Sequence, residues 1–279
     1  MKALAYAKVN LTLEVLGRRA DGYHELRSVV QTVSLADELE LIEADGISCD
    51  SGYEDDLCVK AAQVLARETG VTKGVSVSIK KRIPAGGGLG GGSADAAAVL
   101  TALNEMWNLT MPCGELAEIG AKVGSDVPSL VYGGTVVMEG RGEKVVPVPA
   151  GELPRDPLFL VLVNPGVFCS TRKVFSRCRP RLHEDASILY NMRSALRSGD
   201  WRNVAAASMN DLYASAAALQ SAVSAALESL KAAGASGVTM SGSGSTVFGF
   251  VPDEAQGREI AAQMNAAGLW AECVHTIVR

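Results

Sequence analysis

The stretch from Pro84 to Ala98 reads PAGGGLGGGSADAAA, and it joins a strand-like segment to an alanine-rich one. Before it, Val75, Val77 and Ile79 alternate with polar residues, as in a half-buried strand. After it, the alanines favour a helix. Glycine permits positive φ and lets a ligand approach backbone N–H groups, and a helix start adds unpaired donors and a partial positive charge. The order strand, glycine loop, helix therefore predicts a phosphate-binding site.

The motifs of other phosphate-binding loops match this sequence less well. A Walker loop requires a lysine that this loop lacks. A match to G-x-G-x-x-G is nearly automatic in such a glycine-rich run, and helix-like sequence surrounds Glu105 and Glu115, the acidic residues nearest the dinucleotide spacing. The later signatures of protein kinases are absent. A flexible linker is disfavoured because such a clear helix start follows.

The loop resembles the ATP-binding motif of the GHMP kinases. The resemblance implies an α+β fold of two domains, an N-terminal ribosomal-protein-S5-domain-2-like domain and a C-terminal ferredoxin-like domain. The glycines on both sides of Leu89 are most similar to the branch that phosphorylates a cytidyl diphosphate sugar alcohol in the non-mevalonate isoprenoid pathway. ATP should accompany Mg²⁺, with the Ser93 hydroxyl as the protein's contact to the metal. The expected ATP-binding residues are Pro84, Gly86, Gly87, Gly88, Leu89, Gly90, Gly91, Gly92 and Ser93.

Composition indicates a globular protein with a small-molecule substrate. The chain has 279 residues, 48% of them hydrophobic, and a net charge of −5, which argues against a nucleic-acid partner. Six cysteines without a C-x-x-C pair favour reduced cytosolic thiols, and three histidines make a cysteine–histidine zinc site improbable. No apolar run is long enough for a membrane span, and the N-terminal residues do not resemble a signal peptide. We expect a cytoplasmic monomer or weak homodimer.

Prolines and a glycine between Val148 and Pro157 suggest a domain boundary, which divides the chain into residues 1–150 and 151–279. The second part begins with an apolar strand from Phe159 to Val163. Further on, the pattern predicts helices over 200–233, two strands, a helix over 253–267 and a last strand. The order β-α-β-β-α-β is ferredoxin-like.

The first strand supplies a lysine. Apolar residues take the odd positions from Ala7 to Leu13, so Lys8, Asn10 and Thr12 share the opposite face. Such a face could simply meet water. However, Ala-Lys-Val-Asn-Leu resembles the N-terminal motif of the GHMP kinases, although Tyr6 stands where many members have proline. The resemblance implies that Lys8 and Asn10 line the substrate site.

An aspartate follows in Gly124-Ser125-Asp126-Val127-Pro128. Asp126 could cap the helix that starts at Pro128, act in chemistry, or do both. The segment resembles the family's Gly-x-Asp-Val-Pro motif, which implies that Asp126 is the general base. Lys8 would then keep Asp126 ionised, because a nearby positive charge lowers the pKa of a carboxylate.

A third segment, Asp21-Gly22-Tyr23-His24, could be an ordinary turn before the next strand. It resembles a motif of the cytidyl branch, which implies that Tyr23 stacks on a cytosine and His24 bonds its polar edge. Phe175 is a candidate for the second stacking face.

A fourth segment lies near the C-terminus, where Met240 to Thr246 alternates glycine and serine. It could be a tight turn, but it resembles the family's C-terminal glycine motif, so Ser241, Gly242 and Ser243 are expected at the substrate site. Asn210-Asp211-Leu212 also resembles a family segment, to which we assign no function.

Together these motifs predict an ATP-dependent kinase that phosphorylates the 2-hydroxyl of a cytidyl sugar alcohol. Three alternatives stay open at this level: another small-molecule GHMP kinase such as homoserine kinase, a nicotinamide-dependent oxidoreductase, and a non-catalytic nucleotide sensor. The joint presence of Lys8 and Asp126 argues against the sensor.

Overall fold

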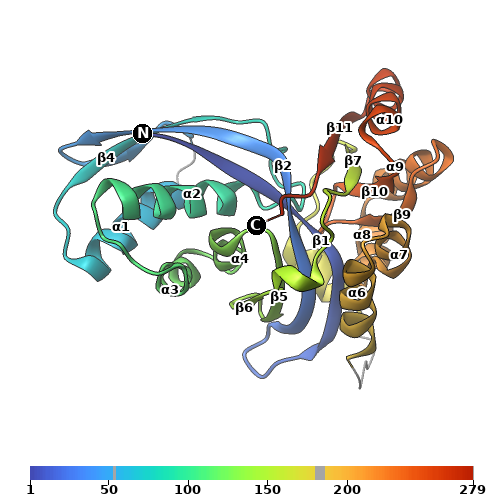
Figure 1. The fold of residues 1–279 in the computed structure, drawn as a ribbon, viewed down its shortest axis with the longest axis horizontal. Coiled ribbons are helices and arrows are strands. Elements are labelled where there is room, and N and C mark those ends of the chain that lie inside the picture. Colours follow the sequence, from blue (N-terminus) through green and yellow to red (C-terminus); the bar gives the residue numbers. More distant parts are fainter. Residues whose placement is uncertain (53–54, 180–185, 279) are drawn as a thin grey trace.

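Two long antiparallel strands lie at the centre of the first sheet. The structure is a computed structural model that describes residues 1–52, 55–179 and 186–278. β1 (Lys2–Arg18) and β2 (His24–Ala44) run from the N-terminal helices to the tip of their own hairpin (Figure 1). Their register shifts at three places, one of them between Tyr6 and Lys8. Such bulges change the direction of side chains, and they are frequent beside active sites.

The first sheet is built around these two strands, in the order β3-β4-β2-β1-β8, and β5 and β6 extend it from β2. Its other strands are β3 (Ile47–Cys49), β4 (Gly74–Lys80), β5 (Thr135–Gly140), β6 (Lys144–Pro147) and β8 (Met209–Asn210). Most neighbouring strands are antiparallel. This sheet is not the doubly wound parallel sheet that a nicotinamide-binding domain requires.

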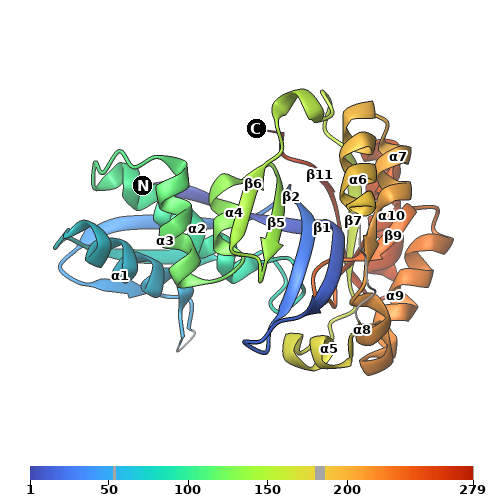
Figure 2. The ribbon, with the colours of Figure 1, turned by 90° about the horizontal axis from the view of Figure 1, so that it is seen from below.

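Four helices gather beside this sheet (Figure 2). They are α1 (Leu57–Thr69), α2 (Gly91–Met106), α3 (Cys113–Val123) and α4 (Val127–Tyr132). The residues of α2 from Ala94 to Leu100 are all buried, because alanine allows the sheet and the other helices to approach closely. Gly90 is the N-cap of α2 and Ser93 lies inside its first turn, so Ser93 does not cap the helix.

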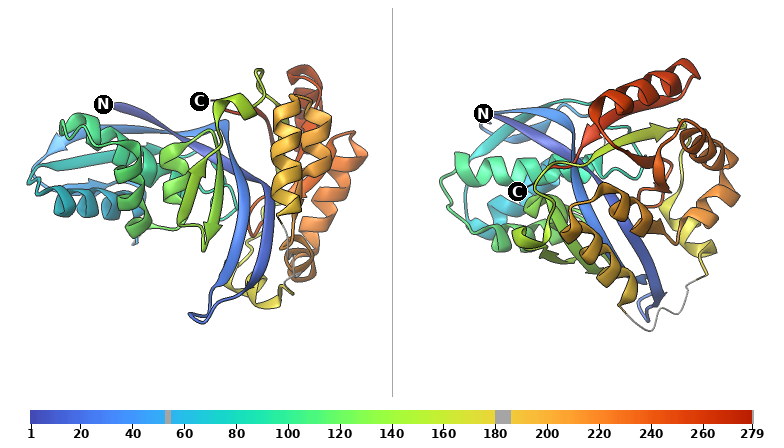
Figure 3. Two further views of the ribbon diagram at one scale, coloured as in Figure 1. Left: turned by 60° about the horizontal axis from the view of Figure 1, so that its bottom comes forward. Right: turned by 45° about the vertical axis from the view of Figure 1, so that its right-hand side comes forward.

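The second sheet has the order β11-β7-β10-β9, with every pair antiparallel. Its strands are β7 (Phe159–Asn164), β9 (Ser236–Met240), β10 (Val247–Val251) and β11 (Trp270–His275). Helices α9 (Ser221–Ala232) and α10 (Glu254–Ala266) pack on it, so the ferredoxin-like order predicted from the sequence is confirmed (Figure 3). The remaining helices are η1 (Ala150–Glu152), α5 (Thr171–Arg177), α6 (Ser187–Ser198), α7 (Trp201–Ala207) and α8 (Tyr213–Leu219).

The parts on either side of residue 150 share one hydrophobic core. Leu160, Leu162 and Phe248 of the second sheet belong to the same buried cluster as Leu11 and Leu100. β8, from the second part, pairs with β1. The division at residue 150 therefore stays a prediction about sequence segments, since the two parts are closely joined in space.

Pro112 is the N-cap of α3. The region 200–233, for which the sequence predicts helices, contains three of them, and the short strand β8 interrupts it because Met209 and Asn210 pair with Thr12 and Leu13 of β1. Within the described residues, no helix is long and apolar enough to cross a membrane.

Candidate active site

Lys8 and Asp126, far apart in the sequence, meet beneath the glycine loop. Their side chains approach to 3.7 Å between Lys8 Nζ and Asp126 Oδ2. Lys8 is 4% exposed, so the first strand does not present it to water. Lys8 Nζ also donates to Asn10 Oδ1 at 2.7 Å, and Asn10 Nδ2 donates to Ser28 Oγ at 2.8 Å. This chain of hydrogen bonds fixes the ammonium group beside the carboxylate.

Burial lowers the pKa of Lys8, and the nearby Asp126 carboxylate only partly offsets that effect. A buried ammonium group with a lowered pKa and a carboxylate partner is typical of functional sites. Lys8 Nζ also lies close to Gly242, where a Cβ atom would be 3.3 Å from it. Lys8 can therefore stabilise negative charge on a further oxygen atom placed there.

Asp126 is the N-cap of α4, but its side chain makes no capping hydrogen bond. The capping role that the sequence left open is thus absent, and the carboxylate is 35% exposed. Its backbone is held instead: Ser129 Oγ donates to the Asp126 carbonyl at 2.7 Å. A rigid backbone with an accessible carboxylate suits proton transfer to and from a bound hydroxyl group.

The carbonyl groups of the glycine loop are bonded to other parts of the chain. Thr246 N donates to Gly87 O at 3.0 Å, Ser241 Oγ to Gly88 O at 2.9 Å, and Lys8 N to Leu89 O at 3.0 Å. The carbonyl groups of the loop are therefore held by β1 on one side and by the segment between β9 and β10 on the other. Its N–H groups, at the start of α2, are the groups suited to bind an anion.

Glycine is required in this loop by geometry. Gly88 has φ +79°, and a Cβ atom there would lie 2.2 Å from the Ser241 carbonyl oxygen. At Gly87 a Cβ atom would lie 2.7 Å from both Asn164 Nδ2 and Thr246 Oγ1. The loop thus lies directly on the C-terminal glycine segment, in contact with Ser241.

Tyr23 and His24 lie at the tip of the β1–β2 hairpin. Tyr23 is 58% exposed, and the His24 ring is 5.2 Å from the Phe175 ring between centroids. Phe175 belongs to α5. The three residues expected to bind the base therefore lie at the tip of the β1–β2 hairpin and on the neighbouring helix α5. Ser243 is nearby in the fold, because its hydroxyl group bonds Thr171 of α5 at 2.9 Å.

Burial lowers the pKa of His24, and the positive charge of Arg18 lowers it further. The imidazole is therefore neutral at pH 7 and offers one donor and one acceptor nitrogen. Such a pair can match the donor and acceptor groups on the edge of a pyrimidine base.

A cluster of charges supports the start of α2. Lys81 Nζ donates to Asp37 Oδ2 at 2.5 Å and to Asp95 Oδ2 at 2.6 Å. Burial raises the pKa of Asp95 to about 7, although Lys81 opposes the shift. Asp95 Oδ1 is buried without a hydrogen-bond partner among the described residues. Asp95 is therefore held by Lys81 through one carboxylate oxygen.

Ser93 is half-buried in the first turn of α2, and its hydroxyl group makes no hydrogen bond to another described residue. Its hydroxyl group is a hard oxygen donor, which fits Mg²⁺ held mainly by phosphate oxygens and water. Among the described residues, one group of three or more metal-ligating side chains comes together: Cys49, Asp56 and Cys58 at the start of α1. Its thiols suit softer metals than Mg²⁺.

Sequence reasoning missed several residues that shape the site. Asn164 and Thr246 support Gly87, and Asn210 Nδ2 donates to the carbonyls of Met240 and Gly242 at 2.6 and 2.8 Å. Asn210 belongs to a segment that resembles the family but has no assigned function, and Thr246 is the last residue of the glycine–serine segment that contains Ser241. Asn164 had no signal, because it lies at the end of a buried strand.

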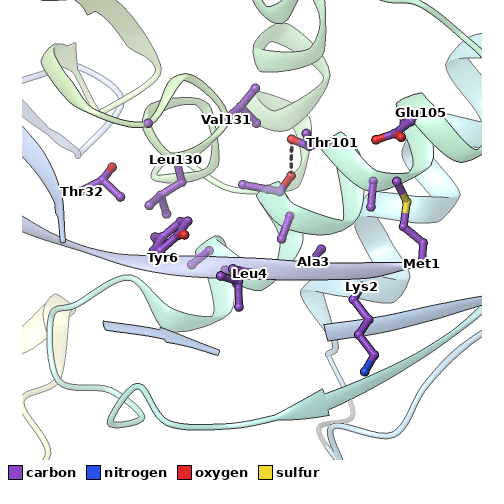
Figure 4. A pocket seen from close by; sticks show the side chains of 16 residues that line it. Met1, Lys2, Ala3, Leu4, Tyr6, Thr32, Thr101, Glu105, Leu130 and Val131 are labelled. Carbon is purple, nitrogen blue, oxygen red and sulfur yellow. Dashed lines mark hydrogen bonds between the residues drawn. The ribbon is translucent and has the colours of Figure 1, made fainter. Parts of the chain in front are cut away.

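A cavity of about 350 Å³ lies away from these residues, between the start of β1, α2 and α4. Figure 4 shows Leu4, Tyr6, Leu130 and Val131 around it, with Thr101 bonded to the α2 backbone. None of the predicted site residues lines it. The volume of this cavity therefore says nothing about the candidate chemistry.

Comparison with known proteins identifies relatives along most of the chain. Residues 56–134 match the family model for the GHMP kinases N terminal domain, and residues 192–268 match that for GHMP kinases C terminal. The chain is 41% identical, over 94% of its length and 92% of the relative, to 4-diphosphocytidyl-2-C-methyl-D-erythritol kinase of Pelotomaculum thermopropionicum. It is 40% identical to the protein of that name from Citrifermentans bemidjiense, over 99% of both chains.

The fold is also similar to that of solved structures. A crystal structure of 4-(cytidine 5'-diphospho)-2C-methyl-D-erythritol kinase matches with a TM-score of 0.84 and 32% identity, over 99% of both chains. Homoserine kinase from Cytophaga hutchinsonii matches with a TM-score of 0.76 and 19% identity, over 100% of this chain and 94% of that one. The second likeness shows a shared fold.

Proposed function

The chain belongs to the GHMP kinase family, and from this premise we propose that it transfers a phosphoryl group from ATP to the 2-hydroxyl of 4-diphosphocytidyl-2-C-methyl-D-erythritol. The products would be ADP and the 2-phosphate, within the non-mevalonate isoprenoid pathway. Its relatives of that name, about 40% identical over most of the chain, support the choice of acceptor. The observation that carries the chemistry is the Lys8–Asp126 pair at 3.7 Å beneath the glycine loop.

One end of the site would bind ATP, and the other end would bind the cytosine of the acceptor. The N–H groups from Gly86 to Gly92 and the start of α2 would hold the phosphates of ATP. Tyr23, His24 and Phe175 would hold the cytosine ring, by stacking and by hydrogen bonds to its edge. Lys8 and Asp126 would then receive the methylerythritol hydroxyl between the two ends. Positioning of this kind supplies much of the catalysis in phosphoryl transfer.

In the transfer step, Asp126 accepts the proton of the 2-hydroxyl group. The hydroxyl oxygen forms a bond to the γ-phosphorus atom, and the bond from that atom to the β–γ bridging oxygen breaks, which releases ADP. Lys8 stabilises the negative charge on the attacking oxygen. Asn10 keeps Lys8 in place through its hydrogen bond to Nζ.

Mg²⁺ belongs to the same proposal. It would neutralise charge on the phosphates of ATP, which is the chemistry that a divalent metal supplies to a kinase. Ser93 is the residue that would contact it, and Ser241, Gly242 and Ser243 would line the acceptor side. The cytoplasmic location and the monomeric or weakly dimeric state stay predictions from the sequence.

An acceptor panel tests the proposal. The purified chain is given ATP and Mg²⁺ with the cytidyl acceptor, with 2-C-methyl-D-erythritol 4-phosphate, with homoserine or with mevalonate, and ADP release is measured. We expect kcat/KM for the cytidyl acceptor to exceed the others by about 100-fold or more, because a site built to bond a base rejects analogues without it. Equal turnover of the acceptor that lacks cytidine would contradict the proposal.

A further inference from the structure

Arg141 lies over the ring of Tyr23, in a part of the chain that no sequence motif singled out. The Arg141 Cζ atom is 5.1 Å from the centroid of the Tyr23 ring. The guanidinium group has no ion-pair partner among residues 1–52, 55–179 and 186–278, whereas Arg19 close by is paired with Asp21 and Glu25. Arg141 thus lies against an aromatic ring without a direct ion pair, although its charge also acts on the Asp21 and Glu143 carboxylates.

The position of Arg141 is fixed by the sheet. β5 pairs with β2 up to Leu26 opposite Gly140, and Arg141 is the next residue. Gly140 has φ +74°, and Arg141 N donates to the Glu143 carboxylate at 2.6 Å, which closes a tight turn between β5 and β6. The turn therefore places Arg141 beside the end of the β1–β2 hairpin, where its guanidinium group lies over the Tyr23 ring.

The same turn reaches the catalytic segment. Gly142 has φ +116°, and a Cβ atom there would lie 3.4 Å from the carbonyl oxygen of Ser125. Ser125 directly precedes Asp126. The four residues from Gly140 to Glu143 therefore contact both the candidate base reader and the segment that carries the candidate general base.

We infer that Arg141 is a positioning residue for the acceptor: its guanidinium group holds one face of the Tyr23 ring so that the other face receives the cytosine. This inference rests on the proposed function, because it requires an acceptor with a flat base. An exposed tyrosine on a hairpin tip would otherwise lose side-chain freedom when the base binds. A cation over an aromatic ring reduces that freedom in advance.

Steady-state kinetics of Arg141→Met and Arg141→Lys test the inference. Arg141→Met should raise the KM for the cytidyl acceptor about three- to tenfold, with kcat and the KM for ATP within about twofold of wild type. Arg141→Lys should restore most of the acceptor affinity, since an ammonium group also binds the face of a ring. An unchanged acceptor KM in Arg141→Met, or equal losses in the Met and Lys variants, would overturn the inference.

A matched control and a double variant complete the test. Arg202 lies 4.7 Å over the Trp201 ring, outside the site, so Arg202→Met removes the same kind of contact and should leave every kinetic constant unchanged. In a Tyr23→Leu background, Arg141→Met should have no further effect on the acceptor KM; a full additional loss there contradicts the inference. Turnover of the cytidyl acceptor by wild type tests the proposed function separately from either result.

Discussion

At the scale of the residue, Lys8 shows the conflict between stability and function most directly. Burial is the largest influence on its pKa and lowers it, so the charged form is less stable in the folded chain than in water. The Asp126 carboxylate, 35% exposed and 3.7 Å away, offsets only part of that penalty. A buried charge that is incompletely compensated is typical of a group retained for function.

Replacing Lys8 with methionine should therefore separate the two properties. We predict that Lys8→Met lowers kcat about 100-fold or more, while its free energy of unfolding equals or exceeds that of wild type. Denaturant unfolding and steady-state kinetics measure the two. Lys60→Met is the control: it removes a hydrogen bond to the Val123 carbonyl and should lower stability slightly with normal turnover. A Lys8→Met variant destabilised by more than about 2 kcal/mol would refute this account.

At the scale of the element, the glycine loop depends on its contact with the C-terminal segment. Gly88→Ala would place a methyl group 2.2 Å from a backbone oxygen at Ser241, and neither backbone can yield easily. We predict a rise in the KM for ATP of about tenfold or more. Gly70→Ala is the matched control, because Gly70 has φ +73° but open space around it, so it tests backbone strain alone. If both variants bind ATP equally well, the loop is not held as described.

The helix that follows the loop has a pH-sensitive support. The pKa of Asp95 is about 7 in the folded chain and near 3.8 in the unfolded chain, chiefly because of burial. Between these values the folded chain binds a proton that the unfolded chain releases, so stability falls as the pH rises from about 4 to 7. Above pH 7 the penalty is complete, because Asp95 is then ionised in the folded chain as well as in the unfolded chain.

Asp95→Asn should remove that penalty. We predict a gain in the free energy of unfolding of about 1–3 kcal/mol at pH 8, and a smaller gain or none at pH 5. Chemical denaturation at the two pH values measures it. An effect that is the same at both values, whether gain or loss, would show that Asp95 is ionised throughout, and a loss at pH 8 would show that its charge stabilises the fold.

At the scale of the whole molecule, local patterns predicted most elements but not how they meet. Alternation in β4 and the alanines of α2 are signals within one segment, and these elements are where the sequence placed them. β8 has two residues and exists only because β1 lies beside it, so no local pattern could predict it. For the same reason the sequence could suggest the β-α-β-β-α-β order but not the strand order of the sheet.

Some residues of the candidate site could be predicted from the sequence and others could not. Lys8, Asp126 and the glycine loop belong to motifs, so the sequence could name them, and the structure brings them together. Asn164, at the end of a buried strand, contacts the loop, and Arg141, in a hairpin turn, contacts Tyr23 across the fold. Their relevance depends on distances that no spacing in the sequence contains.

The measurement that tests the central claim most directly is phosphorus NMR of the chain incubated with ATP, Mg²⁺ and 4-diphosphocytidyl-2-C-methyl-D-erythritol. Wild type should convert ATP to ADP with one new phosphomonoester resonance on the acceptor. Asp126→Asn should reduce that rate about 10²- to 10⁴-fold while ATP still binds, whereas Asp253→Asn, which changes the exposed N-cap of α10, should not. Absence of the new phosphomonoester with wild type, or near-normal turnover by Asp126→Asn, would contradict the account.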